Sequence, residues 1–241
     1  MDNKTIRKWP RTLGALLFSF GILLGILLST AITWASFEAV FYGFARLSTD
    51  QLGTLSCPLL MTTSDTRTVS AEFTNPGNKP TQILVRADIS TPALVRKEQE
   101  LLAFAPGETK KLAWTVNADN VDLRYFIFVK AYQYPSAAGG TREATCGIFV
   151  LPLSFASGTQ VFIATLTVSL LSILTGLFFW ERNTSRIVKR EIEISRAMKV
   201  LAVIVLVGLL LSFQGNWVGG VATLAVSILL MGAILFFTQN R

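Results

Sequence analysis

The sequence predicts an α+β membrane protein with four transmembrane helices and an extracytoplasmic, antiparallel β-sandwich of about seven strands between the first two helices. Three observations predict this fold class. Four long apolar runs contain a single charged residue, Lys199 near the start of the third, the segment between the first two alternates apolar and polar residues, and positive charge gathers on one side of the predicted topology. Of the 241 residues, 51% are hydrophobic and only 15% are charged, a balance that soluble domains rarely show.

The four apolar runs are the predicted membrane spans. Each is close to the roughly 20 residues that a helix needs to cross about 30 Å of hydrocarbon. The predicted spans are 12–36, 159–180, 197–213 and 217–237, and the third is the shortest. Tryptophan prefers the headgroup level, and four tryptophans lie at or near span ends. These predicted interface anchors are Trp9, Trp34, Trp180 and Trp217.

The first run has an alternative interpretation as a cleaved signal peptide. Its leader is basic, and Thr33-Trp34-Ala35 is a conceivable cleavage site. Against this, a signal peptide's apolar core usually has about 7 to 15 residues, and this run is longer. We therefore favour an uncleaved anchor, and a mature chain that begins at Ser36 would contradict the four-span prediction.

The net charge of +7 fixes the predicted orientation. The N-terminal segment 1–11 and the loop 181–196 are basic, whereas the stretch from Glu38 to Glu143 has 11 basic and 11 acidic residues. Basic residues beside spans stay in the cytoplasm, which predicts that both termini, including 238–241, are cytoplasmic and that residues 37–158 are extracytoplasmic. The predicted cytoplasmic basic residues near the second and third spans are Arg182, Arg186, Lys189, Arg190, Arg196 and Lys199.

A helical pattern continues past the first span. Phe37, Val40, Phe41, Phe44 and Leu47 recur at spacings of three and four, which predicts an amphipathic helical extension over 37–54. One interpretation is that the first helix simply continues out of the membrane. The other is an interfacial helix, or a docking face for a partner, with its aromatic residues at headgroup depth.

Residues 55–152 change to a period of two, which is typical of strands with one buried face. Dense turn signals at 75–80, 105–108 and 135–140 separate the runs. The predicted strands are Leu55–Met61, Val69–Thr74, Ile83–Ile89, Glu100–Phe104, Leu112–Val116, Tyr125–Tyr132 and Thr145–Leu151.

The chain has two cysteines, Cys57 and Cys146, in the first and last predicted strands. Both fall on the predicted extracytoplasmic side, where a disulfide can persist. Closing a loop of about 90 residues stabilises a domain by roughly 4 to 5 kcal/mol on the chain-entropy model. The sequence therefore predicts a disulfide, and the alternative is two buried thiols that never meet.

The predicted strand domain resembles bacterial immunoglobulin-like or fibronectin-like modules. The unit Val69–Pro80 and the turn Ala105-Pro106-Gly107-Glu108 before Leu112–Val116 carry the resemblance. The two cysteines join terminal strands, unlike the antibody pattern, so no ligand-binding residues transfer. The resemblance implies adhesion or assembly.

Catalytic signals are nearly absent. The chain has no histidine, which removes the commonest general base and metal ligand. The acidic pairs Glu98 with Glu100 and Asp119 with Asp122 read as solvated charges, and the only ionisable residue in the predicted spans is Lys199, near the start of the third. Charged pathways in pumps use such residues. We predict that the chain is not an enzyme, with no cofactor, catalytic residue or metal site.

Small residues at helical spacing mark the predicted helix-packing faces. Thr165, Ser169, Ser172 and Gly176 line one face of the second span, and Gly21 and Gly25 form a Gly-x-x-x-Gly in the first. Such faces let helix backbones approach closely. They serve packing within this chain or contact with another subunit.

The sequence predicts a non-catalytic multi-pass membrane protein that acts as a scaffold, assembly factor or accessory subunit through its extracytoplasmic domain. The alternative is an auxiliary subunit of a transporter or channel whose pathway another chain supplies. The expected partners are the lipid bilayer and one or more proteins, with anionic lipid at the basic cytoplasmic face and no nucleic acid. Because the predicted outer domain has no Asn-x-Ser/Thr sequon, we expect a bacterial plasma membrane.

Overall fold

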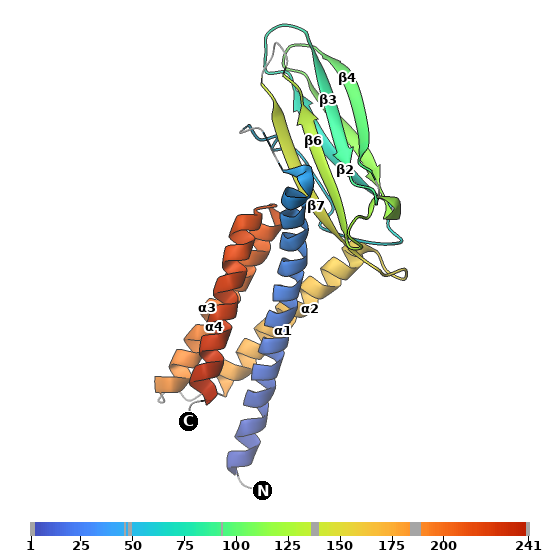
Figure 1. Cartoon of the computed structure of the whole chain (residues 1–241). Coiled ribbons are helices and arrows are strands. Elements are labelled where there is room, and N and C mark those ends of the chain that lie inside the picture. Colours follow the sequence, from blue (N-terminus) through green and yellow to red (C-terminus); the bar gives the residue numbers. More distant parts are fainter. Residues whose placement is uncertain are drawn as a thin grey trace. The chain divides into compact units, whose positions relative to one another are not determined.

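The computed structural model describes residues 3–45, 47, 50–92, 94–135, 140–183 and 189–239, without the side chains of 3–8, 189–190 and 234–239. The chain divides into two compact units (Figure 1). The helical unit comprises Met1–Thr33 and Val161–Arg241, and the sheet unit comprises Trp34–Gln160. The fold therefore combines helices with sheets, as the sequence predicts.

Four α-helices are described: α1 (Asn3–Ala39), α2 (Gly158–Arg182), α3 (Lys189–Phe213) and α4 (Trp217–Gln239). Three described stretches are long and apolar enough to cross a membrane, namely Trp9–Phe44, Gly158–Arg182 and Glu191–Phe213. The apolar part of α4 with described side chains, Trp217–Ala233, is shorter. The three longer spans thus have helices to match them, and the fourth span stays a prediction.

The predicted helical extension over 37–54 is wrong beyond Phe44. A single π-helical turn, η1 (Val40–Phe44), follows α1, and within it Gly43 has a φ of +83°. That left-handed conformation suits glycine and turns the chain out of the helix. Leu52 then donates a backbone hydrogen bond to Glu143, so the segment pairs with a strand instead of continuing as a helix.

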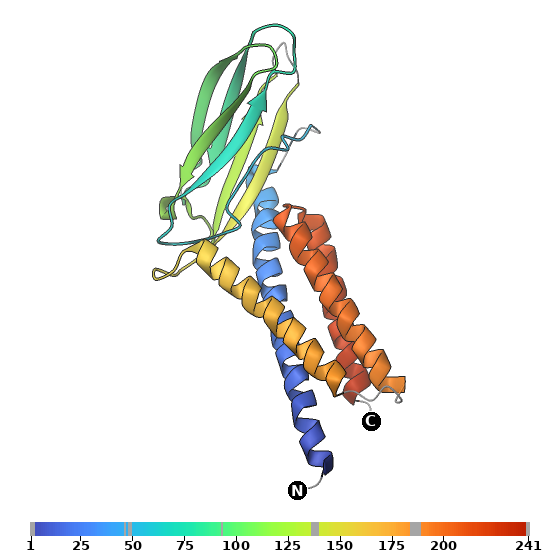
Figure 2. The same ribbon diagram turned by 180° about the vertical axis from the view of Figure 1, so that it is seen from behind.

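Seven strands are described in the sheet unit, and each predicted strand overlaps one of them. They are β1 (Leu60–Thr62), β2 (Arg67–Thr74), β3 (Thr81–Ile89), β4 (Arg96–Phe104), β5 (Thr109–Val116), β6 (Phe126–Gln133) and β7 (Arg142–Leu151). A short 3-10 turn, η2 (Ala118–Asn120), precedes β6. Five strands form one sheet in the order β1-β7-β6-β3-β4, and β2 pairs with β5 in a second sheet; Figures 1 and 2 show them from opposite sides.

Two details of the strands differ from the prediction. The pair β1–β7 is parallel, whereas every other described strand pair is antiparallel. Alternation within a strand does not indicate which strand pairs with it or in which direction. After β1 the chain enters the second sheet as β2, and β1 pairs instead with the last strand, β7. Cys57 lies outside β1, between the isolated bridge of Ser56 with Ser70 and the start of the strand.

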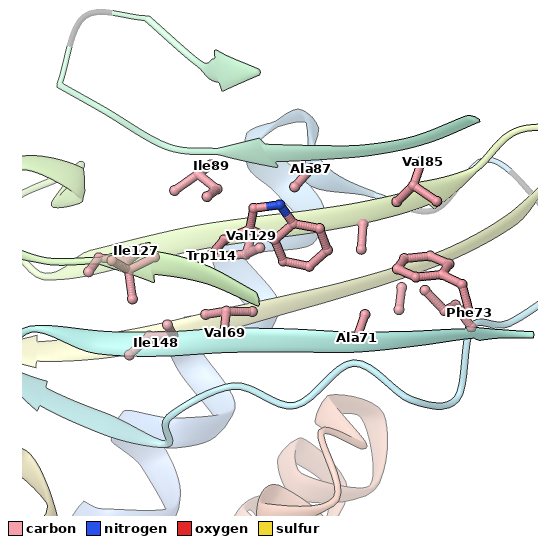
Figure 3. Packing of buried hydrophobic residues seen from close by; sticks show 14 of the residues in the cluster. Val69, Ala71, Phe73, Val85, Ala87, Ile89, Trp114, Ile127, Val129 and Ile148 are labelled. Atoms are coloured by element: carbon pink, nitrogen blue, oxygen red, sulfur yellow. The ribbon is translucent and has the colours of Figure 1, made fainter. Parts of the chain in front are cut away.

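Side chains from both sheets form one hydrophobic core. Val69 and Trp114, from β2 and β5, lie in the same buried cluster as Val85, Val129 and Ile148 from the five-stranded sheet (Figure 3). The alternating burial of β2 and β5 agrees with the predicted period of two. Burial of apolar surface on this scale is the main stabilising contribution to such a unit.

The strand directions sort the loops of the sheet unit into two ends. The strand pairings place the last residues of β3 and β7 at the same end as the first residues of β4 and β6. The start of α2 also lies at this end, together with loops 90–95, 117–125 and 152–157. We call this the helix end. Loops 75–80 and 105–108 lie at the opposite, distal end.

Candidate functional site

Close contact between α1 and α2 organises the helical unit. The hydroxyl of Ser169 donates a 2.7 Å hydrogen bond to the carbonyl oxygen of Gly21. At Gly176, a Cβ atom would lie 2.4 Å from the backbone nitrogen of Phe18, so only glycine fits there without movement. Small residues allow this approach, and the hydroxyl strengthens it.

The remaining predicted packing residues are Gly25, Ser172 and Thr165. A Cβ on Gly25 would meet Val205 of α3 at 2.8 Å and the Ser169 hydroxyl at 3.2 Å. Ser172 is buried and Thr165 is half-buried. The structure therefore brings Gly21, Gly25, Ser169 and Gly176 together inside this chain, which is the first of the two interpretations that the spacing left open.

A second polar contact in the helical unit escaped the sequence analysis. Ser212 on α3 has its hydroxyl 2.9 Å from that of Ser29 and 2.8 Å from that of Thr33, both on α1. All three side chains are buried. A small recess nearby is lined by Ile26, Ser29, Ile204, Val205, Gly208, Thr223, Leu224 and Ser227. Hydroxyl residues within apolar helices indicate that hydrogen bonds between helices are possible. The sequence does not show which hydroxyl groups meet, because that depends on the tertiary structure.

Charged side chains connect the helices at one end of the helical unit. Arg11 on α1 pairs with Glu191 on α3, and Lys199 on α3 pairs with Glu181 on α2. The Arg11 guanidinium also lies 4.5 Å from the ring centroid of Trp180. These pairs connect three helices.

Of the other predicted basic residues, two have described side chains. Arg182 and Arg196 are exposed. Arg186 lies outside the described residues, as do the side chains of Lys189 and Arg190.

The predicted tryptophan anchors differ in exposure. Trp9 and Trp34 are exposed, Trp217 is half-buried, and Trp180 is buried beneath Arg11. Two of the four thus present large exposed apolar surfaces.

In the sheet unit, a buried ion pair holds the segment that follows α1. Lys130 on β6 and Glu143 on β7 lie 3.2 Å apart, nitrogen to oxygen. The Lys130 ammonium donates to the carbonyl oxygen of Ala45, and the Leu47 N–H donates to Oε2 of Glu143 at 2.6 Å. Thr145 adds a bond to the carbonyl oxygen of Phe44. We call residues 44–52 the strap.

A second polar cluster adjoins this pair on the same face of the sheet. Arg86 donates to both carboxylate oxygens of Asp88, at 2.6 and 2.7 Å, and to the Tyr134 hydroxyl. The hydrogen bonds to Asp88 raise the pKa of Arg86 above its usual range. Burial, with the Asp88 charge, raises the pKa of Tyr132 to about 12. Tyr132 therefore stays neutral, and its ring lies over the Lys130 ammonium at 4.5 Å.

The cysteines form the predicted disulfide. Cys57 and Cys146 are bonded, with 6.6 Å between their Cα atoms and 89 residues between them in sequence. Both side chains pack against the hydrophobic core. The bridge joins the segment before β1 to β7, so the loop that it closes contains β1 to β6.

The start of α2 is fixed to the sheet by a carboxylate. Asp65 accepts hydrogen bonds from the N–H groups of Gly158, at 2.7 Å, and Thr62, at 3.0 Å. Burial by itself would raise the pKa of Asp65, but these hydrogen bonds and the nearby Arg67 hold it below its ordinary value. A negative charge here also suits the positive end of the α2 dipole.

Among the described residues, no group of three or more His, Cys, Asp or Glu side chains could hold a metal ion. Glu98 and Glu100 are exposed on β4, and Asp119 is exposed in η2. The described polar clusters are instead pairs and hydrogen bonds that fasten one segment to another.

No family model matches the sequence, and no curated protein matches it. Among solved structures, the chain is similar to beta-glucuronidase 2 of Bacteroides uniformis, with 12% identity over 39% of this chain and 12% of that one, at a TM-score of 0.31. It is also similar to red sea bream transglutaminase, with 15% identity over 49% and 18% of the two chains and a TM-score of 0.33. A third similar structure is a cycloisomaltooligosaccharide glucanotransferase of Paenibacillus sp., with 16% identity over 44% of this chain and 15% of that one, at a TM-score of 0.32. The chain spans less than a fifth of each, and likenesses this weak carry no argument.

Proposed function

We propose that the chain is a non-catalytic multi-pass membrane protein that acts as a scaffold, assembly factor or accessory subunit. In this proposal α1 to α4 all span a bacterial plasma membrane, with both termini in the cytoplasm. The sheet unit is an immunoglobulin-like β-sandwich on the extracytoplasmic side, where it contacts a protein partner.

One observation carries the proposal: a disulfide-closed sheet unit is inserted between two membrane-length helices. Disulfides persist outside the reducing cytoplasm, which favours an extracytoplasmic sheet unit. A rigid unit held beside a membrane is suited to presenting a surface to a neighbour. The buried ion pair and the carboxylate cap support this, because within the sheet unit they hold the segment that follows α1 and the first residue of α2 against the strands.

Reporter fusions test the topology. Alkaline phosphatase is active only after export, so a fusion after Gln214, between α3 and α4, should be active and a fusion after Arg241 should be inactive. Activity at both positions would show that α4 does not span. The reverse pattern would contradict the proposed orientation.

Gentle solubilisation followed by native mass measurement tests the assembly role. We expect the chain to leave the membrane together with another protein, and crosslinks from the sheet unit to that protein would support a scaffold. A monodisperse free monomer would contradict the proposal.

The alternative function is an auxiliary subunit of a transporter or channel. The four predicted spans contain one ionisable residue, Lys199 near one end of the third, so this alternative needs another chain to supply the charged pathway. A co-purified multi-span protein with charged residues in its spans would support this alternative.

A further inference from the structure

Exposed apolar side chains are unequally distributed over the two ends of the sheet unit. At the helix end, Phe155 is 84% exposed, Leu94 is 79% exposed and Tyr125 is 42% exposed. The described residues of the distal loops 75–80 and 105–108 include no exposed large hydrophobic side chain. Exposed aromatic and aliphatic groups on several separate loops at one end mark an interaction surface.

Three different loops carry these side chains, and hydrogen bonds join two of the loops to each other and to the end of β7, from which the third loop begins. Ser90 donates its hydroxyl hydrogen to the carbonyl oxygen of Asn120, which connects the loop carrying Leu94 to the loop carrying Tyr125. Val150 donates its N–H to the carbonyl oxygen of Tyr125, which connects the second loop to the end of β7, before Phe155. The exposed groups are therefore positioned by the fold.

The tip of the middle loop adds a positive charge. Leu123 and Arg124 have φ values of +48° and +71°, a conformation that non-glycine residues rarely adopt. Leu123 packs against the buried cluster around Phe126, whereas Arg124 is exposed. Strained backbone of this kind persists where the surroundings impose it, and it often accompanies function.

The neighbouring chain segments indicate what covers this surface. The chain leaves the helix end at Gly158 as α2, which is long and apolar enough to span a membrane. The last turns of α1 pack against the sheet close by, where a Cβ on Gly147 would overlap the carbonyl oxygen of Ala35. Trp34 on those turns and Phe41 in the following turn, η1, are also exposed.

We propose that the helix end of the sheet unit docks onto the bilayer surface, with Leu94, Tyr125 and Phe155 at headgroup depth and Arg124 beside lipid phosphate. Aromatic rings prefer this depth, and arginine matches the geometry of phosphate. The inference rests on the proposed membrane insertion of α2. It adds that the sheet unit lies against the membrane by its own loops as well as by the helices.

Tryptophan substitutions in the full-length protein, reconstituted in phosphatidylcholine vesicles, test this surface. We compare Phe155→Trp and Leu94→Trp with the wild type in vesicles whose lipids carry bromine close to the headgroup. The emission that each substitution adds should shift to the blue and be lost to bromine quenching, while aqueous acrylamide should have little effect. Each side chain is exposed, so the disulfide and the fold should remain.

Two matched controls separate docking from general adsorption. Leu101→Trp on β4 and Leu47→Trp on the strap replace exposed leucines away from the helix-end loops. Their added emission should be quenched by acrylamide and not by brominated lipid. If Phe155→Trp and Leu94→Trp behave like these controls, bilayer docking is wrong, and a protein partner becomes the alternative for this surface.

A third variant distinguishes failure of this inference from failure of the proposed function. Leu174 is exposed in the middle of α2, so the added emission of Leu174→Trp should be quenched by lipids brominated deep in the chain. Quenching at Leu174 without quenching at Phe155 would overturn docking and leave the span intact. Quenching at neither position would overturn membrane insertion as well.

Discussion

Lys130 Nζ lies 3.2 Å from Glu143 Oε2, in an ion pair whose side chains are only 2% and 5% exposed. Both members also bind the strap, through Ala45 and Leu47. The pair therefore fastens the segment that follows α1 to the face of the five-stranded sheet opposite its core.

Replacing Lys130 with methionine should strongly destabilise the sheet unit. The substitution leaves the Glu143 charge buried without its partner, and such breaks cost about 3 to 5 kcal/mol. Chemical denaturation of the full-length protein in detergent, followed by tryptophan fluorescence, measures the free energy of unfolding. The double variant Lys130→Met with Glu143→Met should recover much of the loss.

The exposed pair of Arg96 and Glu98 provides the control. Arg96 Nε lies 3.0 Å from Glu98 Oε1, but the two side chains are 37% and 45% exposed. Exposed pairs contribute about 0 to 1 kcal/mol, so Glu98→Gln should change the free energy of unfolding little. Equal losses for the buried and exposed pairs would contradict this account.

Much of the sheet unit could be predicted from alternation alone. Val69, Ala71 and Phe73 are buried on β2, and Ile83, Val85, Ala87 and Ile89 are buried on β3, as their period of two indicates. The strap could not be predicted, because its bonds use backbone groups of residues 44–52 that no side-chain pattern encodes. The helical spacing of the apolar residues from Phe37 to Leu47 even predicted a helix where the chain leaves the helix after Phe44.

Some polar contacts between the helices could be predicted from the sequence, and others could not. Spacing identified Ser169 and Gly176 as a packing face, because a helix repeats every 3.6 residues. Spacing could not identify the contact of Ser29 with Ser212, since 183 residues separate them. Lysine at position 130, directly after the apolar run Phe126–Val129, was a usable signal that the sequence analysis missed.

Removing the disulfide by Cys57→Ala with Cys146→Ala should lower the free energy of unfolding by about 4 to 5 kcal/mol, because the open chain regains the entropy of a long loop. Chemical denaturation, followed through the unfolding transition of the sheet unit, measures this loss of free energy. Reductant should destabilise the wild type to a similar extent and leave the double variant unchanged. A double variant as stable as the wild type would show that the bridge does not constrain the unfolded chain.

Gly176→Leu should separate α1 from α2. Its Cβ would lie 2.4 Å from the Phe18 nitrogen and 2.7 Å from the Phe18 Cα, so the helices must move apart. Overpacking of this kind costs about 1 to 3 kcal/mol or more. Thermal melting in detergent should show a lower transition temperature, and Ser169→Leu should act in the same direction.

Gly232→Leu is the matched control for this contact, because a Cβ there meets nothing within 4 Å. It should leave the melting temperature nearly unchanged. A loss at Gly232 equal to that at Gly176 would show that leucine itself, and not the α1–α2 contact, destabilises the helical unit.

Asp65 should make the sheet unit sensitive to acid. Burial alone would raise its pKa, but hydrogen bonds from Gly158 and Thr62 hold it below the ordinary value of 3.8. Because the folded pKa is the lower one, the ionised carboxylate stabilises the fold fully above about pH 4 and loses this contribution as the pH falls through the folded pKa. Asp65→Asn keeps an oxygen that can accept these hydrogen bonds but removes the charge, so it should lower stability at neutral pH by about 0.3 to 1 kcal/mol and flatten the acid slope. Glu100→Gln, which alters an exposed carboxylate on β4, should keep the wild-type slope, and an unchanged slope in Asp65→Asn would show that the acid sensitivity arises elsewhere.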